Sequence, residues 1–412
     1  MEPNAIAVLC GDLNMLRCFA GSDTDTVTVC TSASNVTLRS RHCRRRALIT
    51  DPLRDSDQTL ADLLQLARDL PDKPVLFYGD DATLRLVSRH RDELAPHFRF
   101  LLPPAETVED MVDKARFAGL AERLNLPVPR TLLSSQVETP EQALNYLELP
   151  CVLKPNSHIG WFHSKLILEE GGTPQKALRA DNLEEFRRLF TKMKSHGVDF
   201  VMQEYIEGGD DCIYSFHAYF SRDHQPLGYY VGKKIRTYPK GSGLSTYVEL
   251  AHDPQIVQVG LEVLRKLDFV GVVKIDFKKD PRRGKLSLLE INPRFNLWNY
   301  LGAVCGVNLP MLAYRDIVGL PCEPQITWRS GVRWLSFMDD LRAFVRGYHH
   351  DGDLTWTQYL ASLHAHKVHD VFSWSDPLPW AVAVGQASKN YAKRFLPGQR
   401  SHTPMMRKGV AK

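Results

Sequence analysis

At 412 residues the chain is too long for a single hydrophobic core, so two or three domains are expected. The formal net charge of +4 is small for this length and does not indicate a nucleic-acid-binding protein. No signal-peptide pattern opens the chain, no apolar run approaches the roughly 20 residues that span a bilayer, and the scattered cysteines form no C-x-x-C pair. These features predict a cytoplasmic protein without a membrane segment, a disulfide framework or structural zinc.

Residues 1–102 have the pattern of a small doubly wound α/β domain. Short apolar runs at 5–10, 25–30 and 74–80 predict buried strands, and residues 59–70 predict an amphipathic helix. One glycine follows the first strand, so the G-x-G-x-x-G fingerprint of dinucleotide binding is absent. An oxidoreductase is therefore not expected.

One basic run, RSRHCRRR at residues 39–46, lies within this first region. A run of like charges is more often a solvated segment than a binding site. We therefore interpret it as a solvated loop, with a site for a polyanion as the alternative.

A linker with two prolines, residues 101–106, leads into a second region. The elements predicted there are a helix closed by Pro127, a strand at 150–156, a helix at 182–197, a strand–turn–strand unit at 200–220, a strand at 228–239, a helix at 254–267 and a hairpin at 273–296. After residue 326 the aromatic-rich segments predict a helical C-terminal extension.

The hairpin, VKIDFKKDPRRGKLSLLEINPRFN, interleaves core-type apolar residues with polar ones. Because strand side chains alternate between faces, Glu290, Asn292 and Arg294 share one face, and the turn brings Asp276 beside them. Carboxylate and amide oxygens suit magnesium shared with phosphates, and a guanidinium suits a phosphate oxygen. A surface hairpin with ordinary salt bridges is the alternative, but it does not explain an acid inside the apolar run LLEINPR.

Two further segments are consistent with nucleotide binding. Lys154 lies in the apolar strand CVLKP, where a lysine is costly unless it meets an anion, although it can also snorkel to the surface. In QEYIEGGDD, backbone groups of Glu204 to Ile206 could pair with an adenine edge, and Asp210 or Asp211 could reach a ribose hydroxyl. A simple acidic turn is the alternative there.

The order of these motifs resembles that of the ATP-grasp enzymes over roughly residues 100–325. The motifs are DK at 113–114, VLKP at 152–155, QEYIEGGDD at 203–211, KID at 274–276 and LLEINPR at 288–294. Within that superfamily the chain is similar to the predicted ATP-dependent carboligases, or carboxylate–amine ligases, that include D-aspartate ligase-like enzymes.

The resemblance implies an α/β and α+β fold in three parts. These are a Rossmann-like pre-ATP-grasp domain (1–102), a two-lobed ATP-grasp core (103–325) with a lid lobe near 140–205, and a helical extension (326–412). For the nucleotide, the resemblance implies phosphate binding by Lys114 and Lys154, an adenine hinge at Glu204, Tyr205 and Ile206, and ribose binding by Asp211. For the metal, it implies binding of Mg²⁺ or Mn²⁺ by Asp276, Glu290 and Asn292. It also implies that Arg294 binds the acyl phosphate or the γ-phosphate. In VGKKIRTYP, Arg236 and Lys233 are candidates to stabilise the transferring phosphoryl group, exposed strand charges being the alternative. Lys176 is a further candidate phosphate ligand.

The implied reaction joins a small-molecule carboxylate to an amine (or a thiol) through an acylphosphate, with ATP cleaved to ADP and phosphate. The alternative within the superfamily is a carboxylase or carbamoyl-phosphate-type enzyme that activates bicarbonate. A two-metal enzyme acting on nucleic acid and a non-catalytic nucleotide-binding module are less favoured, because the net charge is small and the acid cluster is intact. The expected partners are the small-molecule substrates and a second copy of the chain in a homodimer, without nucleic acid or membrane.

Overall fold

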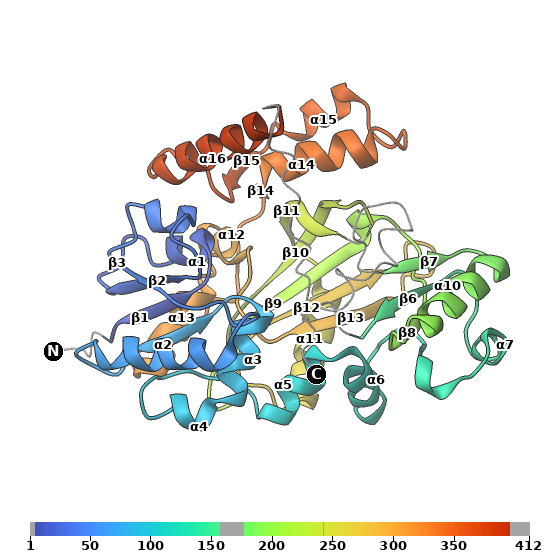
Figure 1. Cartoon of the computed structure of the whole chain (residues 1–412), viewed down its shortest axis with the longest axis horizontal. Coiled ribbons are helices and arrows are strands. Elements are labelled where there is room, and N and C mark those ends of the chain that lie inside the picture. Colours follow the sequence, from blue (N-terminus) through green and yellow to red (C-terminus); the bar gives the residue numbers. More distant parts are fainter. Residues whose placement is uncertain (1–4, 157–176, 242, 396–412) are drawn as a thin grey trace, which may run out of the picture.

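The computed structural model describes residues 5–156, 177–241 and 243–395, the last six by their backbone alone. Within these residues three β-sheets are surrounded by helices, which confirms the expected mixture of α/β and α+β structure (Figure 1). No helix in these ranges is long and apolar enough to cross a membrane. Lys176 lies outside the described residues.

The first sheet is parallel, with strand order β3-β2-β1-β4, as in a doubly wound domain. Its elements are β1 (Ala7–Cys10), α1 (Leu13–Arg17), β2 (Thr26–Cys30), η1 (Val36–Arg39), β3 (Arg45–Leu48), α2 (Ser56–Arg68), β4 (Val75–Tyr78), α3 (Asp81–Arg89) and α4 (Arg91–Leu94). The basic run was expected to be a loop, but its last residues form the edge strand β3. Charged side chains on an edge strand hinder pairing with other chains, and they also hide the strand from a search for apolar runs.

The second sheet is antiparallel, with order β5-β8-β6-β7, and has its own apolar core. Its elements are β5 (Thr131–Leu133), η2 (Ser134–Gln136), α7 (Pro140–Leu144), β6 (Cys151–Pro155), β7 (Leu178–Ala180), α10 (Leu183–Ser195) and β8 (Phe200–Glu204). Two helices, α5 (Ala105–Val112) and α6 (Lys114–Arg123), replace the single helix expected before this sheet. They are separated because the Asp113 side chain caps the N-terminus of α6.

The third and largest sheet has the order β13-β12-β9-β10-β11-β14-β15. Its elements and their neighbours are η3 (Asp210–Cys212), β9 (Ile213–Phe220), β10 (Pro226–Tyr238), β11 (Leu244–Ala251), α11 (Pro254–Lys266), β12 (Gly271–Lys279), β13 (Leu286–Asn292), α12 (Asn299–Val304), α13 (Leu309–Val318), β14 (Val332–Leu335) and β15 (His366–His369). The last two strands belong to the C-terminal extension. Besides the expected helices, the extension therefore contributes two strands, and β14 pairs antiparallel with β11.

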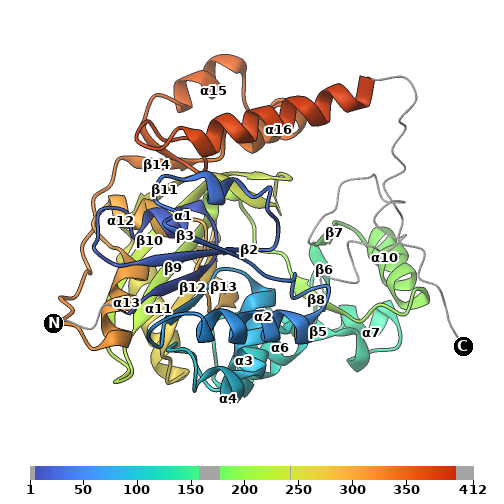
Figure 2. The same cartoon turned by 60° about the vertical axis from the view of Figure 1, so that its left-hand side comes forward.

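The helices of the extension lie above the large sheet and the first domain (Figures 1 and 2). They are α14 (Phe337–Ala343), the π-helical turn η4 (Phe344–Tyr348), α15 (Trp356–Ser362) and α16 (Leu378–Phe395). Arg17 of α1 fixes the extension to the first domain, because its guanidinium donates to the carbonyls of His369, Asp370 and Val371.

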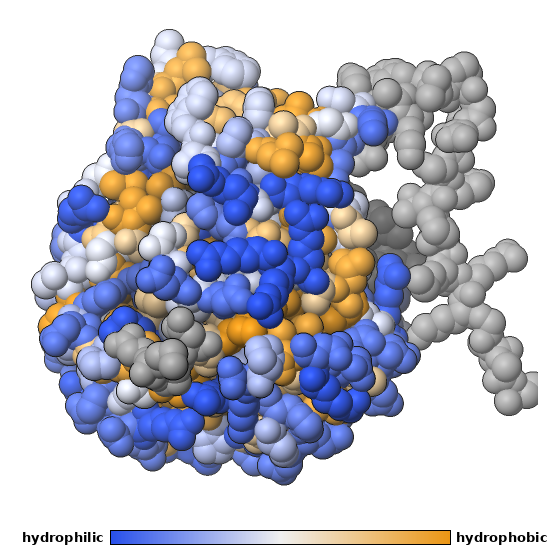
Figure 3. Space-filling view, turned by 90° about the vertical axis from the view of Figure 1, so that its left-hand side faces the viewer, coloured by the Kyte–Doolittle hydropathy of each residue, from blue (hydrophilic) through white to orange (hydrophobic). Residues whose placement is uncertain are grey.

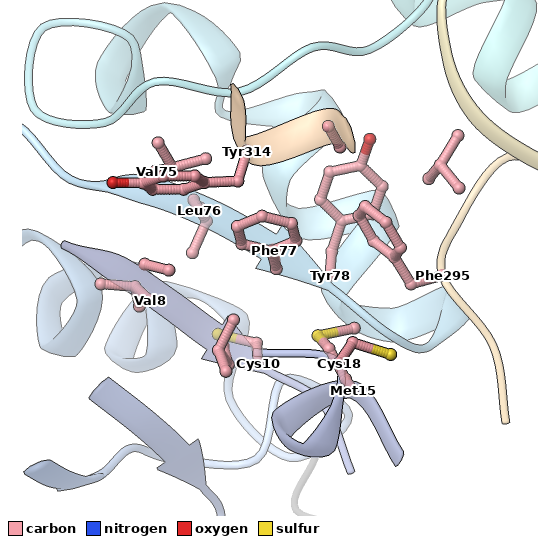
Figure 4. Packing of buried hydrophobic residues seen from close by; sticks show 14 of the residues in the cluster. Val8, Cys10, Met15, Cys18, Val75, Leu76, Phe77, Tyr78, Phe295 and Tyr314 are labelled. Atoms are coloured by element: carbon pink, nitrogen blue, oxygen red, sulfur yellow. The ribbon is translucent and has the colours of Figure 1, made fainter. Parts of the chain in front are cut away.

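The first domain shares its core with the segment that follows β13 (Figure 4). The ring of Phe295 lies 5.1 Å from that of Phe77 and 5.9 Å from that of Tyr78. The N–H of Phe295 also donates to the carbonyl of Tyr78 at 3.3 Å. This packing fixes the chain immediately after the LLEINPR motif against the carboxyl end of β4.

Candidate active site

A cavity of about 260 Å³ lies between the second sheet and the large sheet, and α5 and α6 form part of its wall. Its lining includes, among others, Lys114, Lys154, Gln203, Glu204, Tyr205, Ile206, Asp210, Lys234, Thr237, Asp276, Lys278, Glu290 and Asn292. The part formed by β12 and β13 carries Asp276, Glu290 and Asn292 and is called here the charged end; the part formed by the segment after β8 carries Tyr205 and Ile206 and is called the apolar end. The cavity therefore offers a charged end and an apolar end to one elongated ligand.

The predicted acid cluster forms at the charged end. Asp276 of β12 lies opposite Glu290 of β13, and Lys274 lies opposite Asn292, so all four side chains project from one face. Asn292 Nδ2 donates to Glu290 Oε1 at 3.0 Å. The structure thus brings Asp276, Glu290 and Asn292 together as the alternation of strand residues predicted.

Lysines surround Asp276. Lys274 Nζ donates to Asp276 Oδ2 at 2.8 Å, Lys234 Nζ lies 3.7 Å from the same oxygen, and the hydroxyl of Ser215 donates to Oδ1. Burial alone would raise the pKa of the Asp276 carboxyl, but the two ammonium groups outweigh it and hold that pKa below its usual range. Asp276 is therefore ionised at neutral pH, and it holds two cations near the cavity.

The donor set fits a hard divalent cation that is shared with a phosphate ligand. Glu290 and Asn292 offer oxygens on one face of β13, and Glu290 is exposed to the cavity. Magnesium is commonly held by one or two carboxylates together with substrate phosphates. In the described ranges no group of three His, Cys, Asp or Glu side chains could hold a metal unaided. Any metal here would accordingly need ligand oxygens to complete its coordination.

Lys154 projects from β6 towards this end of the cavity. Its Nζ donates to Gln203 Oε1 at 2.7 Å, and Gln203 Nε2 donates to Thr131 Oγ1 at 2.9 Å, so a short chain of hydrogen bonds fixes the ammonium group. Burial lowers the pKa of Lys154 to about 8, although Glu290 opposes the shift. A lysine held in this way would gain from an anion placed beside it.

We expect the affinity of the protein for ATP to fall as the pH rises above about 8. The protonated ammonium is the form that attracts phosphate, and its pKa in the free protein is about 8. A bound phosphate raises that pKa, so affinity falls by up to about tenfold per pH unit above 8 and is constant below it. Calorimetric titrations at several pH values should show this dependence, and Lys154→Met should weaken binding and remove it. Lys285→Met, which changes a half-exposed lysine, is the control; equal pH profiles for both variants would contradict the assignment.

The apolar end carries the segment expected to form the adenine hinge. Glu204 and Tyr205 donate their N–H groups to the carbonyls of Arg130 and Pro150, at 2.9 and 3.2 Å. In the described chain the N–H of Ile206 donates to no other group, and the residue lines the cavity. One backbone donor is therefore available to an adenine nitrogen at the point where the sequence predicted it.

Asp210, rather than Asp211, lines the cavity. Asp210 is buried, and its Oδ2 accepts from the hydroxyls of Tyr348 and Thr237 and from the N–H of Gly241. Its Oδ1 is buried beside the cavity without a partner in the described residues. Asp211 is exposed and outside the lining, because it lies on the outer side of the turn η3. The ribose assignment to Asp211 is corrected on this ground.

The two candidates on β10 do not reach the cavity either. Neighbouring strand residues face opposite sides, so Lys234 lines the cavity while Lys233 lies on the other face, with its Nζ 5.8 Å from the centre of the Tyr214 ring. Arg236 is 2% exposed, and its Nε and Nη2 donate to the two oxygens of Asp340 at 2.8 and 2.7 Å. This buried pair with α14 leaves Arg236 away from the cavity. The expected phosphoryl contact by Lys233 and Arg236 is therefore corrected.

Arg294 lies at the rim, between the cavity and the first domain. Its Nε donates to Asp81 Oδ1 at 2.5 Å, and Asp81 lines the cavity at the start of α3. The neighbouring Phe295 is fixed against β4, so this guanidinium is held where the two domains meet. The position suits a contact with a group that leaves the charged end of the cavity.

Sequence reasoning did not single out Lys234, Lys274 and Lys278, and it named Asp210 only as the alternative to Asp211. Lys274 and Lys278 stand two residues on either side of Asp276, so the strand alternation used for Glu290 and Asn292 would also have placed them on the cavity face. Lys278 Nζ lies 4.7 Å from the centre of the Tyr205 ring. Lys234 and Lys278, with Lys114 and Lys154, make up the positive lining of the cavity.

Comparisons with known proteins place this geometry in a class. No protein-family model matches the chain. The biotin carboxylase domain of 2-oxoglutarate carboxylase from Hydrogenobacter thermophilus, solved with MgADP, ADP and bicarbonate, superposes with a TM-score of 0.61 at 15% identity, over 80% of this chain and 73% of that one. An L-amino acid ligase from Bacillus licheniformis superposes with a TM-score of 0.54 at 14% identity, over 77% and 75% of the two chains. The fold is that of the ATP-grasp ligases.

Among curated proteins, the chain is similar to the D-aspartate ligase of Enterococcus faecium. The two are 27% identical over 268 residues, which is 62% of this chain and 62% of the relative. The large chain of carbamoyl phosphate synthase from Pyrococcus furiosus is 20% identical over 67% of this chain, but over 26% of its own length. The chain thus spans less than two thirds of each of these relatives.

Proposed function

We propose that the protein is an ATP-dependent carboxylate–amine ligase that works through an acylphosphate and releases ADP and phosphate. The observation that carries the proposal is the joint placement of Glu290, Asn292 and Asp276 with several lysines at one end of a cavity whose other end offers the N–H of Ile206. An elongated ligand with a purine at one end and a polyphosphate at the other matches that arrangement.

Each residue then has a defined task. Glu204, Tyr205 and Ile206 surround the adenine, Asp210 accepts a ribose hydroxyl through its free Oδ1, and Lys114, Lys154 and Lys278 contact phosphate oxygens. A divalent cation held by Glu290 and Asn292, with Asp276 nearby, would neutralise phosphate charge. Catalysis is then mainly positioning and charge stabilisation.

The substrate carboxylate is placed between the charged end of the cavity and the first domain. Its oxygen attacks the γ-phosphorus, the β–γ bond breaks, and ADP leaves with the bond's electron pair. Arg294 holds the resulting acylphosphate at the rim, where an amine attacks the carbonyl carbon and expels phosphate. The 27% identity to a D-aspartate ligase supports an amine acceptor and a small carboxylate, and a cytoplasmic homodimer remains our expectation.

The proposed mechanism fixes the products. ATP should be cleaved to ADP and phosphate, never to AMP and pyrophosphate, because the residues that would hold the cation project from β12 and β13, whereas the adenine segment follows β8. Carboxylate labelled with heavy oxygen should pass one labelled atom to the released phosphate, which mass spectrometry detects in a single turnover.

The assay screens pairs of amino acids as carboxylate and amine with ATP and magnesium. Release of AMP, or phosphate without label, would contradict the ligase mechanism. The bicarbonate-bound neighbour makes bicarbonate activation the second candidate. ADP release that depends on bicarbonate and on no amino acid would favour that reaction instead.

A further inference from the structure

The basic run at residues 39–46 lies directly against the loop that leads into α16. Arg41 Nη1 donates to the carbonyl of Ser375 at 3.1 Å, and the N–H of Arg41 donates to Asp376 Oδ1 at 2.9 Å. The hydroxyl of Ser40 donates to the other oxygen of that carboxylate at 2.7 Å. Two segments from opposite ends of the sequence thus form one continuous surface.

Apolar side chains crowd the loop and the start of α16. Trp374 is 89% exposed, Leu378 54% and Trp380 46%. The ring of Phe372 lies 4.9 Å from that of Trp374 and 5.6 Å from that of Trp380, so the aromatic groups form a single cluster. A cluster of exposed apolar groups marks a surface that contacts something else.

The arginine side chains of the run, which is joined to this loop through Ser40 and Arg41, are exposed. Of the five arginines in the run, Arg45 pairs with Asp25 at 3.0 Å. In the part of the chain that the structure describes, the other four have no carboxylate partner. They are Arg39, Arg41, Arg44 and Arg46. Figure 3, which views the molecule from the side of β3, shows strongly hydrophilic side chains gathered in the middle of this face, below the extension.

The sequence that begins at α16 is basic throughout. Residues 377–412 contain no Asp or Glu, and their basic residues are Lys389, Lys393, Arg394, Arg400, Arg407, Lys408 and Lys412. The chain that follows the Trp374 cluster thus carries seven basic residues and no acid. The neighbouring Asp376 is buried, accepts two hydrogen bonds from the run and lies 3.7 Å from Nη2 of Arg17, so it offsets little of that charge at the surface.

We propose that this surface, defined by Arg39, Arg41, Arg44, Arg46, Trp374, Leu378 and Trp380 and called here the Arg/Trp face, docks the protein on an anionic lipid surface. Tryptophan and leucine favour the boundary between headgroups and acyl chains, and basic side chains beside them attract anionic headgroups. In this proposal the Arg/Trp face rests on the surface of the bilayer.

Two other occupants fit this face less well. A nucleic acid would use the arginines but leaves Leu378 without a role. A second copy meeting through the same face would oppose arginine to arginine. The lipid proposal replaces both our interpretation of the run as a solvated loop and our expectation of no membrane partner.

The test is co-sedimentation of the full chain with vesicles of phosphatidylcholine, alone or with phosphatidylglycerol. We expect binding to the anionic vesicles only, weakened by salt. Each basic residue near the surface strengthens binding about fivefold, so Arg44→Glu with Arg46→Glu should weaken it by at least tenfold. Trp374→Ala should also weaken binding, and it should reduce the quenching of tryptophan fluorescence by lipids with brominated chains. Arg282→Glu with Arg283→Glu, on an exposed turn, and Tyr146→Ala, half exposed in the turn after α7, are the matched controls.

Each alternative outcome overturns the proposal. If the wild-type chain does not sediment with anionic vesicles, an anionic lipid surface is not the partner of this face. Binding that needs the arginines but not Trp374, and that heparin matches in strength, identifies a general polyanion site. Loss of self-association in Trp374→Ala, measured by analytical ultracentrifugation, identifies a second copy as the occupant. Unchanged circular dichroism of each variant confirms that the fold is intact.

Discussion

Replacement of Glu290 by glutamine should lower ATP turnover by about a hundredfold or more and leave the fold intact. The substitution keeps the size of the side chain and its acceptor for Asn292, but it removes the exposed carboxylate at the charged end of the cavity. A divalent cation stabilises a transferring phosphoryl group by several kcal/mol, and each 1.36 kcal/mol corresponds to about tenfold in rate. The measurement is steady-state ADP release as a function of magnesium concentration.

Glu262→Gln, on the exposed face of α11, is the control for this variant. It makes the same chemical change on a side chain that also accepts one hydrogen bond, here from Gln258. Its turnover should equal that of the wild type. A Glu290→Gln protein with full turnover and an unchanged magnesium requirement would show that the metal does not bind here.

Replacement of Asp340 by alanine should destabilise the protein by about 3–5 kcal/mol, because it leaves the buried guanidinium of Arg236 without its partner. For a chain of 412 residues we expect the melting temperature to fall by roughly 5 °C. Turnover per folded molecule, measured well below the melting temperature, should change little because Arg236 lies away from the cavity.

The double variant Arg236→Met with Asp340→Leu provides the matched comparison. Replacing both partners of a buried ion pair by apolar residues is often neutral, so this variant should melt close to the wild type. If Arg236 instead acts in catalysis, as first expected, the double variant would be stable but inactive. That result would contradict the structural role assigned to the pair.

The acid cluster could be predicted from the sequence because it depends on local geometry alone. Glu290 and Asn292 share a strand, and Asp276 lies on the strand joined to theirs by one turn, so alternation and a single hairpin place all three. The alternation of side chains along a strand also places Lys274, two residues before Asp276, on this face, and the sequence alone was sufficient to predict it.

The placement of Arg236 could not be obtained in this way. The pairing of β10 with β11 shifts between Lys234 and Arg236 and again between Arg236 and Thr237, so counting residues along the strand no longer gives the face. The partner that holds Arg236 is Asp340, 104 residues further along the chain. Neither the irregular strand pairing nor a partner so far along the chain can be predicted from a short motif.

Strands β3 and β14 escaped prediction for a different reason. Each is four residues long, and β3 (Arg45–Leu48) has two arginines among its four residues and lies, largely exposed, at the edge of its sheet. Strands of this kind are defined by the neighbour they pair with, not by their own apolar pattern. The sequence indicates a chain rich in arginine there, and only the parallel pairing with β2 makes it a strand.

The strand β14 also changes what counts as one cooperative unit. Residues Tyr247, Val248 and Glu249 of β11 pair with Arg333, Trp334 and Leu335, so the hydrogen-bonded ladder runs across the boundary once expected at residue 326. Trp334 is 1% exposed, and its indole nitrogen donates to Asn14 Oδ1 in the first domain at 3.1 Å. Loss of this strand would expose the edge of β11, empty a large apolar site and unpair Asn14 together. We therefore expect the first domain, the large sheet and the extension to unfold in one cooperative transition. The extension should not stay folded after the other two have unfolded.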